Sequence, residues 1–289
     1  MSTNRPIELR AGAAAATIDP ERGGRLASLS IGGRELLVGP SSPPDATISW
    51  GSFLMAPWPG RLAEGRLRWR GGTIQLPRTH GRHAIHGLVS GVPWRVDAAG
   101  AREASLSVGL EPLGWPFAGT VRQGFELTPS GLRMTASIEA GQAMPAALGW
   151  HPWFLRRGPG QVHVKLAATA TLQTRGMIPT GRSLALGRRT DLRTGPALGA
   201  RRLDDAYVGV TSPAVVRWPD LELRLEFENT VAVVVHTRAD RFCVEPQTAW
   251  PNALGLEGED ASRAGRRILE PGDTLRAELR LSWNDRAVG

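Results

Sequence analysis

Apolar and polar residues alternate along much of the chain, in short segments that end at glycine or proline. The alternation is strictest near the C-terminus, where charged or polar residues separate Leu275, Ala277, Leu279, Leu281 and Trp283. Successive side chains of a β-strand point to opposite faces, so a period of two predicts a strand with one buried face. We therefore expect the C-terminal segment to be a half-buried strand.

Paired glycines between such segments predict β-hairpins. Gly32-Gly33 separates an apolar segment over residues 26–31 from Leu36-Leu37-Val38, and Gly71-Gly72 separates residues 66–70 from residues 73–76. The same pattern of short apolar segments and turn signals recurs through the rest of the chain. Further strands are expected at residues 104–110, 120–127, 132–139, 162–166, 221–227 and 231–236.

The chain shows no apolar pattern typical of an amphipathic helix of ten or more residues. No repeat and no linker divides the sequence, and β-sandwiches of this length often form one domain. We expect residues 1–289 to form a single all-β domain, built as a large antiparallel two-sheet β-sandwich.

The charge balance is basic, with a net charge of +8 and a pI near 11.1. Lys165 is the sole lysine, so nearly all of the 35 basic residues are arginines, and they are scattered rather than gathered into a long tract. Nucleic-acid binding would call for a clustered basic face. The scattered arginines favour a solvated surface, and we expect no nucleic-acid partner.

Targeting signals are missing from the sequence. No apolar run approaches the roughly 18 residues of a membrane helix, and Ala13–Ala16 is too short for the core of a signal peptide. Cys243 is the sole cysteine, so an intrachain disulfide is excluded, and its apolar neighbours predict a buried, unreactive thiol. We expect a cytoplasmic protein without a membrane partner, present as a monomer or a homodimer.

Two segments each place one ionisable side chain among uncharged neighbours. His151 lies in Gly149-Trp150-His151-Pro152-Trp153-Phe154, and Glu245 lies in Val244-Glu245-Pro246-Gln247-Thr248. Burying an ionised carboxylate costs several kcal/mol unless it is paired, so Glu245 is a candidate functional residue, with a structural salt bridge as the alternative. Taken alone, His151 is more consistent with a core histidine that makes one backbone hydrogen bond.

Three other residues are candidates for binding a ligand. Arg61 follows Pro57-Trp58-Pro59-Gly60, which fixes the backbone and suits a guanidinium aimed at a hydroxyl or carboxylate; a surface arginine is the alternative. Asp204 is followed by a second aspartate, a pattern typical of turns. Trp153 belongs to a set of ten tryptophans, whose indole rings fill cores or line pockets for sugar rings.

His80, His83 and His86 follow one another at intervals of three residues, as in some metal clusters. The surrounding window lacks the glutamate or cysteine that zinc sites usually add, so we expect no metal site. His86 precedes Gly87, which permits close approach of a ligand or of backbone, and is therefore a candidate binding residue. Phosphate loops and dinucleotide fingerprints are missing as well, and we expect no cofactor.

Several segments occur in the same order and spacing as in a known family. They are Gly23-Gly24-Arg25-Leu26, Gly60-Arg61-Leu62, Ile85-His86-Gly87-Leu88, the segments around His151 and Glu245, Leu203-Asp204-Asp205-Ala206-Tyr207, Pro251-Asn252-Ala253 and Leu269-Glu270-Pro271-Gly272-Asp273. In these segments the chain resembles the aldose 1-epimerase (galactose mutarotase) family over nearly its whole length.

The resemblance implies the large antiparallel β-sandwich of that family and a mutarotase that interconverts the α and β anomers of a free aldohexose. It implies Glu245 as the general base and His151 as the general acid. It also implies that His86, Arg61 and Asp204 hold the oxygens of the monosaccharide. Trp153 replaces a tyrosine of the family and Gly60 a common asparagine, which leaves the identity of the sugar open and includes a hexose 6-phosphate.

Two other functions remain open at this point. A sugar-binding module without catalysis would keep the tryptophans and Arg61 but would not need both Glu245 and His151. A glycosidase would use Glu245 with Asp204 or Asp205 as paired carboxylates, and it would release a new reducing end from a glycoside.

Overall fold

Strands dominate the molecule. The computed structural model describes residues 5–40, 47–156 and 162–285, and these contain 25 strands, one short α-helix and four 3₁₀ helices. The strands pair in antiparallel fashion in every sheet, so the predicted all-β class is confirmed. The helical elements are α1 (Gly258–Arg263) and 3₁₀ turns at Pro20–Arg22, Ala63–Gly65, Glu111–Leu113 and Ala253–Gly255.

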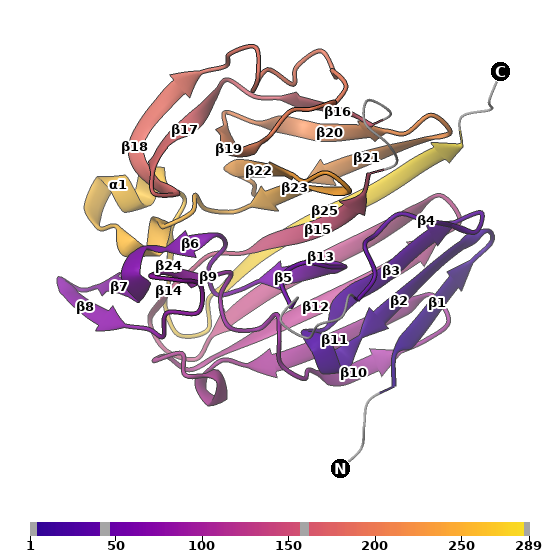
Figure 1. Ribbon diagram of the computed structural model, residues 1–289. Helices are drawn as coiled ribbons and strands as arrows, with labels where there is room; N and C mark the ends of the chain where they lie inside the picture. Colours follow the sequence, from indigo (N-terminus) through magenta and orange to yellow (C-terminus); the bar gives the residue numbers. More distant parts are fainter. Residues whose placement is uncertain (1–4, 41–46, 157–161, 286–289) are drawn as a thin grey trace.

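The larger of the two main sheets has eleven strands and crosses Figure 1 from β1 at the right to β18 at the upper left. Its order along the sheet is β1 (Ile7–Ala11), β2 (Ala14–Asp19), β3 (Arg25–Ile31), β5 (Ser52–Met55), β15 (Gly149–Leu155), β23 (Arg241–Gln247), β22 (Ala232–Thr237), β19 (Asp204–Val208), β17 (Ala170–Arg175) and β18 (Ile178–Ala185), with β4 (Arg34–Glu35) beside β3.

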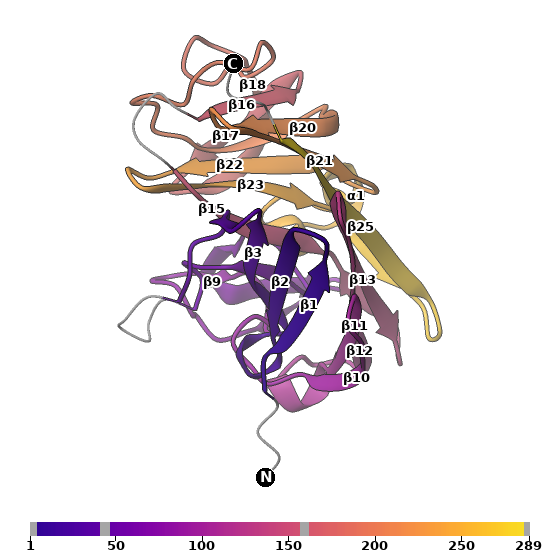
Figure 2. The ribbon, with the colours of Figure 1, turned by 90° about the vertical axis from the view of Figure 1, so that its right-hand side faces the viewer.

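The second main sheet has eight strands and lies behind the first as a facing layer, which Figure 2 shows from the side. Its order is β10 (Arg95–Ala99), β11 (Glu103–Gly109), β12 (Gly119–Thr128), β13 (Gly131–Ala140), β25 (Thr274–Asp285), β21 (Leu221–Phe227), β20 (Thr211–Arg217) and β16 (His163–Ala167). The two layers together confirm the predicted two-sheet sandwich.

The hydrophobic core fills the space between these sheets. In β25 all five alternating apolar residues of the C-terminal prediction are buried, and Leu279 is fully buried. Burying one such leucine contributes about 1.5–3 kcal/mol. Strands of the larger sheet send one face into the same core, as Phe242 and Val244 of β23 do, and leave their other face free to form a site.

The first predicted hairpin forms, but its second strand is shorter than expected. Gly32-Gly33 turns β3 into β4, with Ile31 opposite Arg34. The prediction that Leu36–Val38 forms the returning strand is wrong, because Leu36 makes the last bond to β3, through the Leu29 carbonyl, and the chain then bonds to the end of β15. The Val38 N–H donates to the Trp153 carbonyl at 2.9 Å, and burial of all three apolar side chains explains the detour.

Three small ribbons complete the fold, and two of them lie beside the larger sheet near its centre (Figure 1). The second predicted hairpin is confirmed as β7 and β8, where Leu67 is buried and Arg66 and Arg68 are exposed. The ribbons are β6 (Arg61–Leu62) with β9 (Ala84–Ile85), β7 (Arg66–Trp69) with β8 (Gly72–Gln75), and β14 (Met144–Ala146) with β24 (Arg267–Leu269).

Gly87 allows the chain after β9 to lie directly against β5. It has a left-handed backbone with φ of 72°, and the next residue, Leu88, donates its N–H to the Ala56 carbonyl at 2.8 Å. A Cβ at Gly87 would lie 1.9 Å from that carbonyl oxygen, so only glycine fits without movement of the backbone. The predicted close approach of backbone at Gly87 is therefore confirmed.

Gly87→Ala tests this constraint, with Gly71→Ala as the matched control. Gly71 has a similar φ of 77°, but a Cβ there meets nothing within 4 Å. We expect Gly71→Ala to lower the free energy of unfolding by about 1–2 kcal/mol, the cost of a left-handed alanine. Gly87→Ala should lose about 1–3 kcal/mol more, because the backbone must also shift. Equal losses in urea denaturation would contradict the packing argument.

Candidate active site

The site is built on the face of the larger sheet that points away from the core. Side chains alternate along β23, so Glu245 and Gln247 share this face while Val244 faces the core. The pairing of Gly149 with Gln247 and of Trp153 with Cys243 sets the register that puts Glu245 opposite His151 of β15. The sheet order thus brings together two segments that lie almost a hundred residues apart in the sequence.

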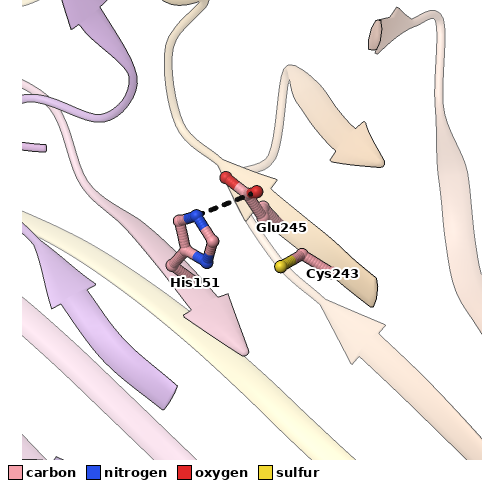
Figure 3. Close-up of side chains that lie close together, drawn as sticks. All are labelled: His151, Cys243 and Glu245. Atoms are coloured by element: carbon pink, nitrogen blue, oxygen red, sulfur yellow. Dashed lines mark ion pairs between the residues drawn. The ribbon is translucent and has the colours of Figure 1, made fainter. Parts of the chain in front are cut away.

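His151 and Glu245 are in direct contact. Nε2 of His151 lies 3.2 Å from Oε1 of Glu245, and Figure 3 shows the two side chains facing each other across neighbouring strands. Their side chains are only 7% and 3% exposed, so water screens the contact weakly. The second carboxylate oxygen accepts a hydrogen bond from Nε2 of Gln247 at 3.2 Å. His151 is therefore more than a core histidine bonded to backbone, and the partner of Glu245 is this histidine rather than an arginine.

Burial moves the pKa values of both groups toward their neutral forms. It raises the pKa of Glu245 well above the ordinary value, and the nearby Asp204 carboxylate raises it further. Burial also lowers the pKa of His151 well below 6.5, and His86 and His236 add to that effect. The two shifts consequently favour a pair that holds one proton and carries no net charge.

Aromatic rings hold the His151 imidazole in place from both sides. The Phe53 ring stacks on it with a centroid separation of 4.7 Å, and the Trp153 ring lies 5.1 Å away. Behind Phe53 lies the fully buried Arg25, whose guanidinium carbon is 5.3 Å from the Phe53 ring. Arg25 donates to the backbone carbonyls of Arg22, Trp50 and Ser90, so the support itself is rigid.

His86 lies next to His151 on the segment that follows β9. Their rings meet edge to face at 5.0 Å, and His86 is 7% exposed. Its backbone φ of 59° is rare for a residue with a side chain, and its N–H donates to the Gly60 carbonyl at 2.9 Å. Burial, together with the charge of Arg61, lowers the pKa of His86 to about 3, so this imidazole is neutral near pH 7.

Arg61 reaches the same pocket from β6, where it pairs with Ile85 beside His86. The preceding Gly60 has a φ of 66°, and a Cβ there would lie 2.7 Å from Pro251. This close packing confirms that glycine constrains the backbone before Arg61. Across the described residues no ion pair or hydrogen bond is recorded for its guanidinium, which leaves those donors free to meet a ligand.

Asp204 enters the pocket from β19, directly opposite His236 of β22. Nδ1 of His236 lies 3.5 Å from the Asp204 carboxylate, and Nε2 of His236 accepts a hydrogen bond from Nε of Arg238 at 3.3 Å. Burial would raise the pKa of Asp204, but the bond from His236 and the charges of His236, Arg61 and His86 lower it overall. Asp204 is therefore an ionised acceptor at neutral pH.

One pocket gathers all six residues that the sequence predicts for the site. Glu245 and His151 form its buried floor, and the walls include His86, Arg61, Asp204 and Trp153. The adjacent Asp205 is not part of it, because Arg189 binds that carboxylate in bidentate fashion at 2.6 and 2.8 Å. Of the other tryptophans, Trp58 and Trp150 fill the core.

Among the pocket residues that sequence reasoning missed, His236, Arg238 and Gln247 are the ones that make polar contacts with the predicted residues or with one another. His236 ends an apolar strand and shares a face with Val234, so the strand period was available as a signal. Arg238 lies in the turn that follows, and no local pattern separates it from the many other arginines. The sequence indicates Gln247 only as a member of the motif around Glu245.

The histidine row from His80 to His86 does not act as a unit. Nδ1 of His83 accepts the Glu64 N–H at 3.1 Å and faces away from the pocket, whereas His80 lies at the exposed rim. In the described residues the ligand atoms of His151, Cys243 and Glu245 lie within 4.8 Å of one another (Figure 3). Burial raises the pKa of the Cys243 thiol well above its usual value, which keeps the thiol protonated.

The fold and the site define a β-sandwich protein with a histidine–carboxylate pair at the floor of a pocket. The family model for aldose 1-epimerase matches residues 5–282, and the chain belongs to that family. A family relative, the uncharacterized protein YihR of Escherichia coli K12, is 31% identical over 157 residues. That match covers 52% of this chain and 50% of YihR, so only about half of the relative is spanned.

Solved structures share the fold over nearly the whole chain. A candidate aldose 1-epimerase from E. coli K12 has a TM-score of 0.86 at 20% identity and covers 98% of this chain and 99% of its own. A galactose mutarotase-like protein from Clostridium acetobutylicum has a TM-score of 0.85 at 19% identity, with 96% and 95% covered. The GalM/aldose epimerase homologue from C. elegans has a TM-score of 0.82 at 17% identity, with 97% and 99% covered.

Helices contribute little to this molecule beyond short turns. Within the described parts of the chain, none is long and apolar enough to cross a membrane.

Glu245→Gln tests the cost of the buried carboxyl. The folded pKa is raised above the ordinary 4.5, so above pH 4.5 the folded state keeps a proton that the unfolded chain releases, and stability falls as pH rises. Glutamine cannot ionise. At pH 8 we expect the variant to exceed the wild type in free energy of unfolding by roughly 0.5–2 kcal/mol.

The difference should shrink as the pH falls toward 4.5, where the carboxyl of the unfolded wild type also takes up a proton. Denaturant unfolding at a series of pH values measures it, and Glu103→Gln, at an exposed position, is the control for loss of one carboxylate. A gap that widens toward acid would contradict the assigned direction of the pKa shift.

Proposed function

We propose that this protein is an aldose 1-epimerase that interconverts the α and β anomers of a free aldohexose by general acid–base catalysis. The observation that carries the proposal is the 3.2 Å contact between His151 and Glu245 at the floor of the pocket. The family membership supports the reaction class.

The contact suits the geometry of a hemiacetal. Ring opening removes the proton from O1 and adds one to the ring oxygen O5, and both oxygens are bonded to C1. The base and the acid that serve them must therefore be neighbours, as Glu245 and His151 are. Each proton transfer of this kind contributes roughly 10²- to 10⁴-fold to the rate.

The proton count balances over one turnover. The pair starts with one proton, which burial places on Glu245 and which transfer across the 3.2 Å contact moves to His151. His151 then gives it to O5 while Glu245 takes the proton from O1, and the C1–O5 bond breaks to leave the open-chain aldehyde. Rotation about C1–C2 presents the other face of the carbonyl. O5 then attacks C1, His151 recovers the proton from O5, and Glu245 returns one to O1. The reaction as written uses no metal and no organic cofactor.

The remaining pocket residues would hold the sugar. Neutral His86 and ionised Asp204 offer acceptors to hydroxyl groups, Arg61 offers donors, and the Trp153 ring offers an apolar face for the C–H bonds of the pyranose. Around this reaction we also propose a single domain, a monosaccharide as the partner, a cytoplasmic location and a monomeric or homodimeric state.

The structure gives less support to the two other functions. A binding module has no need of two ionisable groups whose burial costs stability. A glycosidase that used Asp205 would have to break the bidentate Arg189 pair first, which leaves Asp204 as the other carboxylate. Release of a reducing end from an aryl glycoside would identify a glycosidase, because a mutarotase cannot produce it.

Glu245→Gln and His151→Asn test the acid–base pair. Each should lower kcat for anomer exchange of α-D-glucose or α-D-galactose by about 10²- to 10⁴-fold, because each removes one proton transfer. Polarimetry measures the exchange and titration by NMR measures sugar binding, which both variants should retain. His163→Asn, on the second sheet, is the control. Wild-type rates no faster than buffer would refute the proposed activity for those sugars.

The pH dependence of kcat gives a further test. The active pair holds one proton, and the lowered pKa of His151 means that a second proton binds only well below pH 6.5. The raised pKa of Glu245 delays loss of the last proton. We expect kcat at saturating sugar, corrected for buffer catalysis, to stay level from pH 6 to pH 7. An inflection near 6.5 would show an ordinary histidine and contradict this assignment.

A further inference from the structure

The segment Gly23-Gly24-Arg25-Leu26 takes part in the family resemblance, but none of its residues lines the pocket of the candidate active site. Packing explains its two glycines. A Cβ at Gly23 would lie 2.2 Å from the Ser90 carbonyl oxygen, and a Cβ at Gly24 would lie 3.0 Å from the Trp94 ring. The start of β3 therefore packs closely on the chain before β10, and the arginine of the segment needs a separate explanation.

Arg25 is a fully buried cation. Its guanidinium donates to the backbone carbonyls of Arg22, Trp50 and Ser90 at 2.7, 3.1 and 2.6 Å. In the described parts of the chain no ion pair is recorded for it, and burial lowers its pKa to about 10, which leaves it charged at neutral pH. Burying a charge without a counter-ion costs free energy. Such a group is a candidate for a functional role.

The charge of Arg25 lies at the end of a series of rings that leads to His151. Its guanidinium carbon is 4.2 Å from the centre of the Trp50 ring and 5.3 Å from the centre of the Phe53 ring. The Phe53 ring in turn stacks on the imidazole at 4.7 Å, with 20° between the planes. Cation–π contacts are strongest where water is excluded, as it is here. Phe53 is thus held by a fixed cation and itself holds the imidazole.

Stacking is the main restraint on the plane of the His151 ring. Nε2 faces Glu245, but Nδ1 is buried and has no recorded hydrogen-bond partner among the described residues. A functional histidine usually has its second ring nitrogen held by a hydrogen bond, which fixes the orientation of the ring. Here the rings of Phe53 and Trp153 provide that restraint instead.

We propose that Arg25 is a positioning residue of the His151–Glu245 pair. Through Phe53 it holds the imidazole in the plane that points Nε2 at the carboxyl group. Its fixed positive charge also opposes a second positive charge on His151, which makes the imidazolium a stronger acid toward O5. The inference rests on the proposed function and adds to it a residue that does not touch the sugar.

The effect of the charge depends on its distance from the imidazole and on the groups around that ring. The two ring contacts place the guanidinium within about 10 Å of the imidazole, where a unit charge in a protein moves a pKa by about one pH unit. Arg25 lowers the pKa of His151, after the larger effects of burial, His86 and His236. The other ionisable groups that face this ring are Glu245 and Cys243, both on β23.

Arg25→Gln tests the role, with Arg266→Gln as the matched control. Arg266 also donates to a backbone carbonyl, that of Leu256, and its guanidinium carbon lies 5.9 Å from the Trp69 ring, but it does not line the pocket. Arg25→Gln should lower kcat for anomer exchange of α-D-glucose or α-D-galactose by about tenfold or more, because the acid is misplaced. KM should stay within about twofold, because no contact with the sugar is lost. Arg266→Gln should change neither.

NMR of the imidazole nitrogens in protein labelled with ¹⁵N-histidine gives a readout that a loss of stability would not move. Arg25→Gln removes a positive charge, so His151 should take up its proton about one pH unit higher than in the wild type. The acid limb of the pH profile of kcat should move upward with it. Arg25→Lys keeps the charge but lacks the planar fork. It should restore the titration of His151 while kcat stays below that of the wild type.

An unshifted titration of His151 or an unchanged kcat in Arg25→Gln refutes the proposal. If that variant does not fold, Phe53→Leu carries the test, because it removes the stacked ring and keeps Arg25. Its kcat should fall without a rise in KM, and an unchanged kcat refutes the proposal. If the wild type exchanges no sugar faster than buffer, the epimerase fails. The titration of His151 needs no sugar and then decides on Arg25 alone.

Discussion

A carboxyl group buried at 2% exposure needs a partner, and the arrangement of this protein follows from giving Glu245 one. The partner is His151, and no local turn can bring these residues together because they are far apart in the sequence. Only the adjacency of β15 and β23 in the larger sheet, at one fixed register, puts the two side chains face to face. A shift of β23 by one residue would turn Glu245 into the core and away from His151.

The same register makes a site from several strands at once. One row across the sheet runs through Phe53, His151, Glu245 and Val234, and the next runs through Trp153, Cys243, His236 and Asp204. The first row holds the His151–Glu245 pair and the Phe53 ring that stacks on His151. In the second row Trp153, His236 and Asp204 line the walls of the pocket. The sheet thus acts as a rigid surface on which the position of a side chain in a row decides what it contacts. The hydrophobic core on the opposite face offsets the free-energy cost of burying the ionisable groups.

The sequence predicts the fold well and the site in part, for different physical reasons. Strand periodicity is local, so the alternation around Leu279 and the glycine turns lead directly to correct strands. The strand prediction for Leu36–Val38 failed because a run of buried apolar residues can pair with either of two strands. Tertiary contacts decide between them. Glu245 is conspicuous because it stands among apolar neighbours. For His236 the strand period predicts only the face on which it lies, because its role depends on which residue lies opposite it.

Under the proposed function, the rows would let one chemistry serve different sugars. The pair at the floor would carry the proton transfers, and β15 and β23 each pair with a neighbouring strand on both sides. Arg238 lies at the rim of the pocket in the connection between β22 and β23, outside the paired strands. Contacts at the far end of the sugar act equally on the ground state and the transition state, so they change KM more than kcat. Substrate identity can therefore vary at the rim while His151 and Glu245 keep the same geometry.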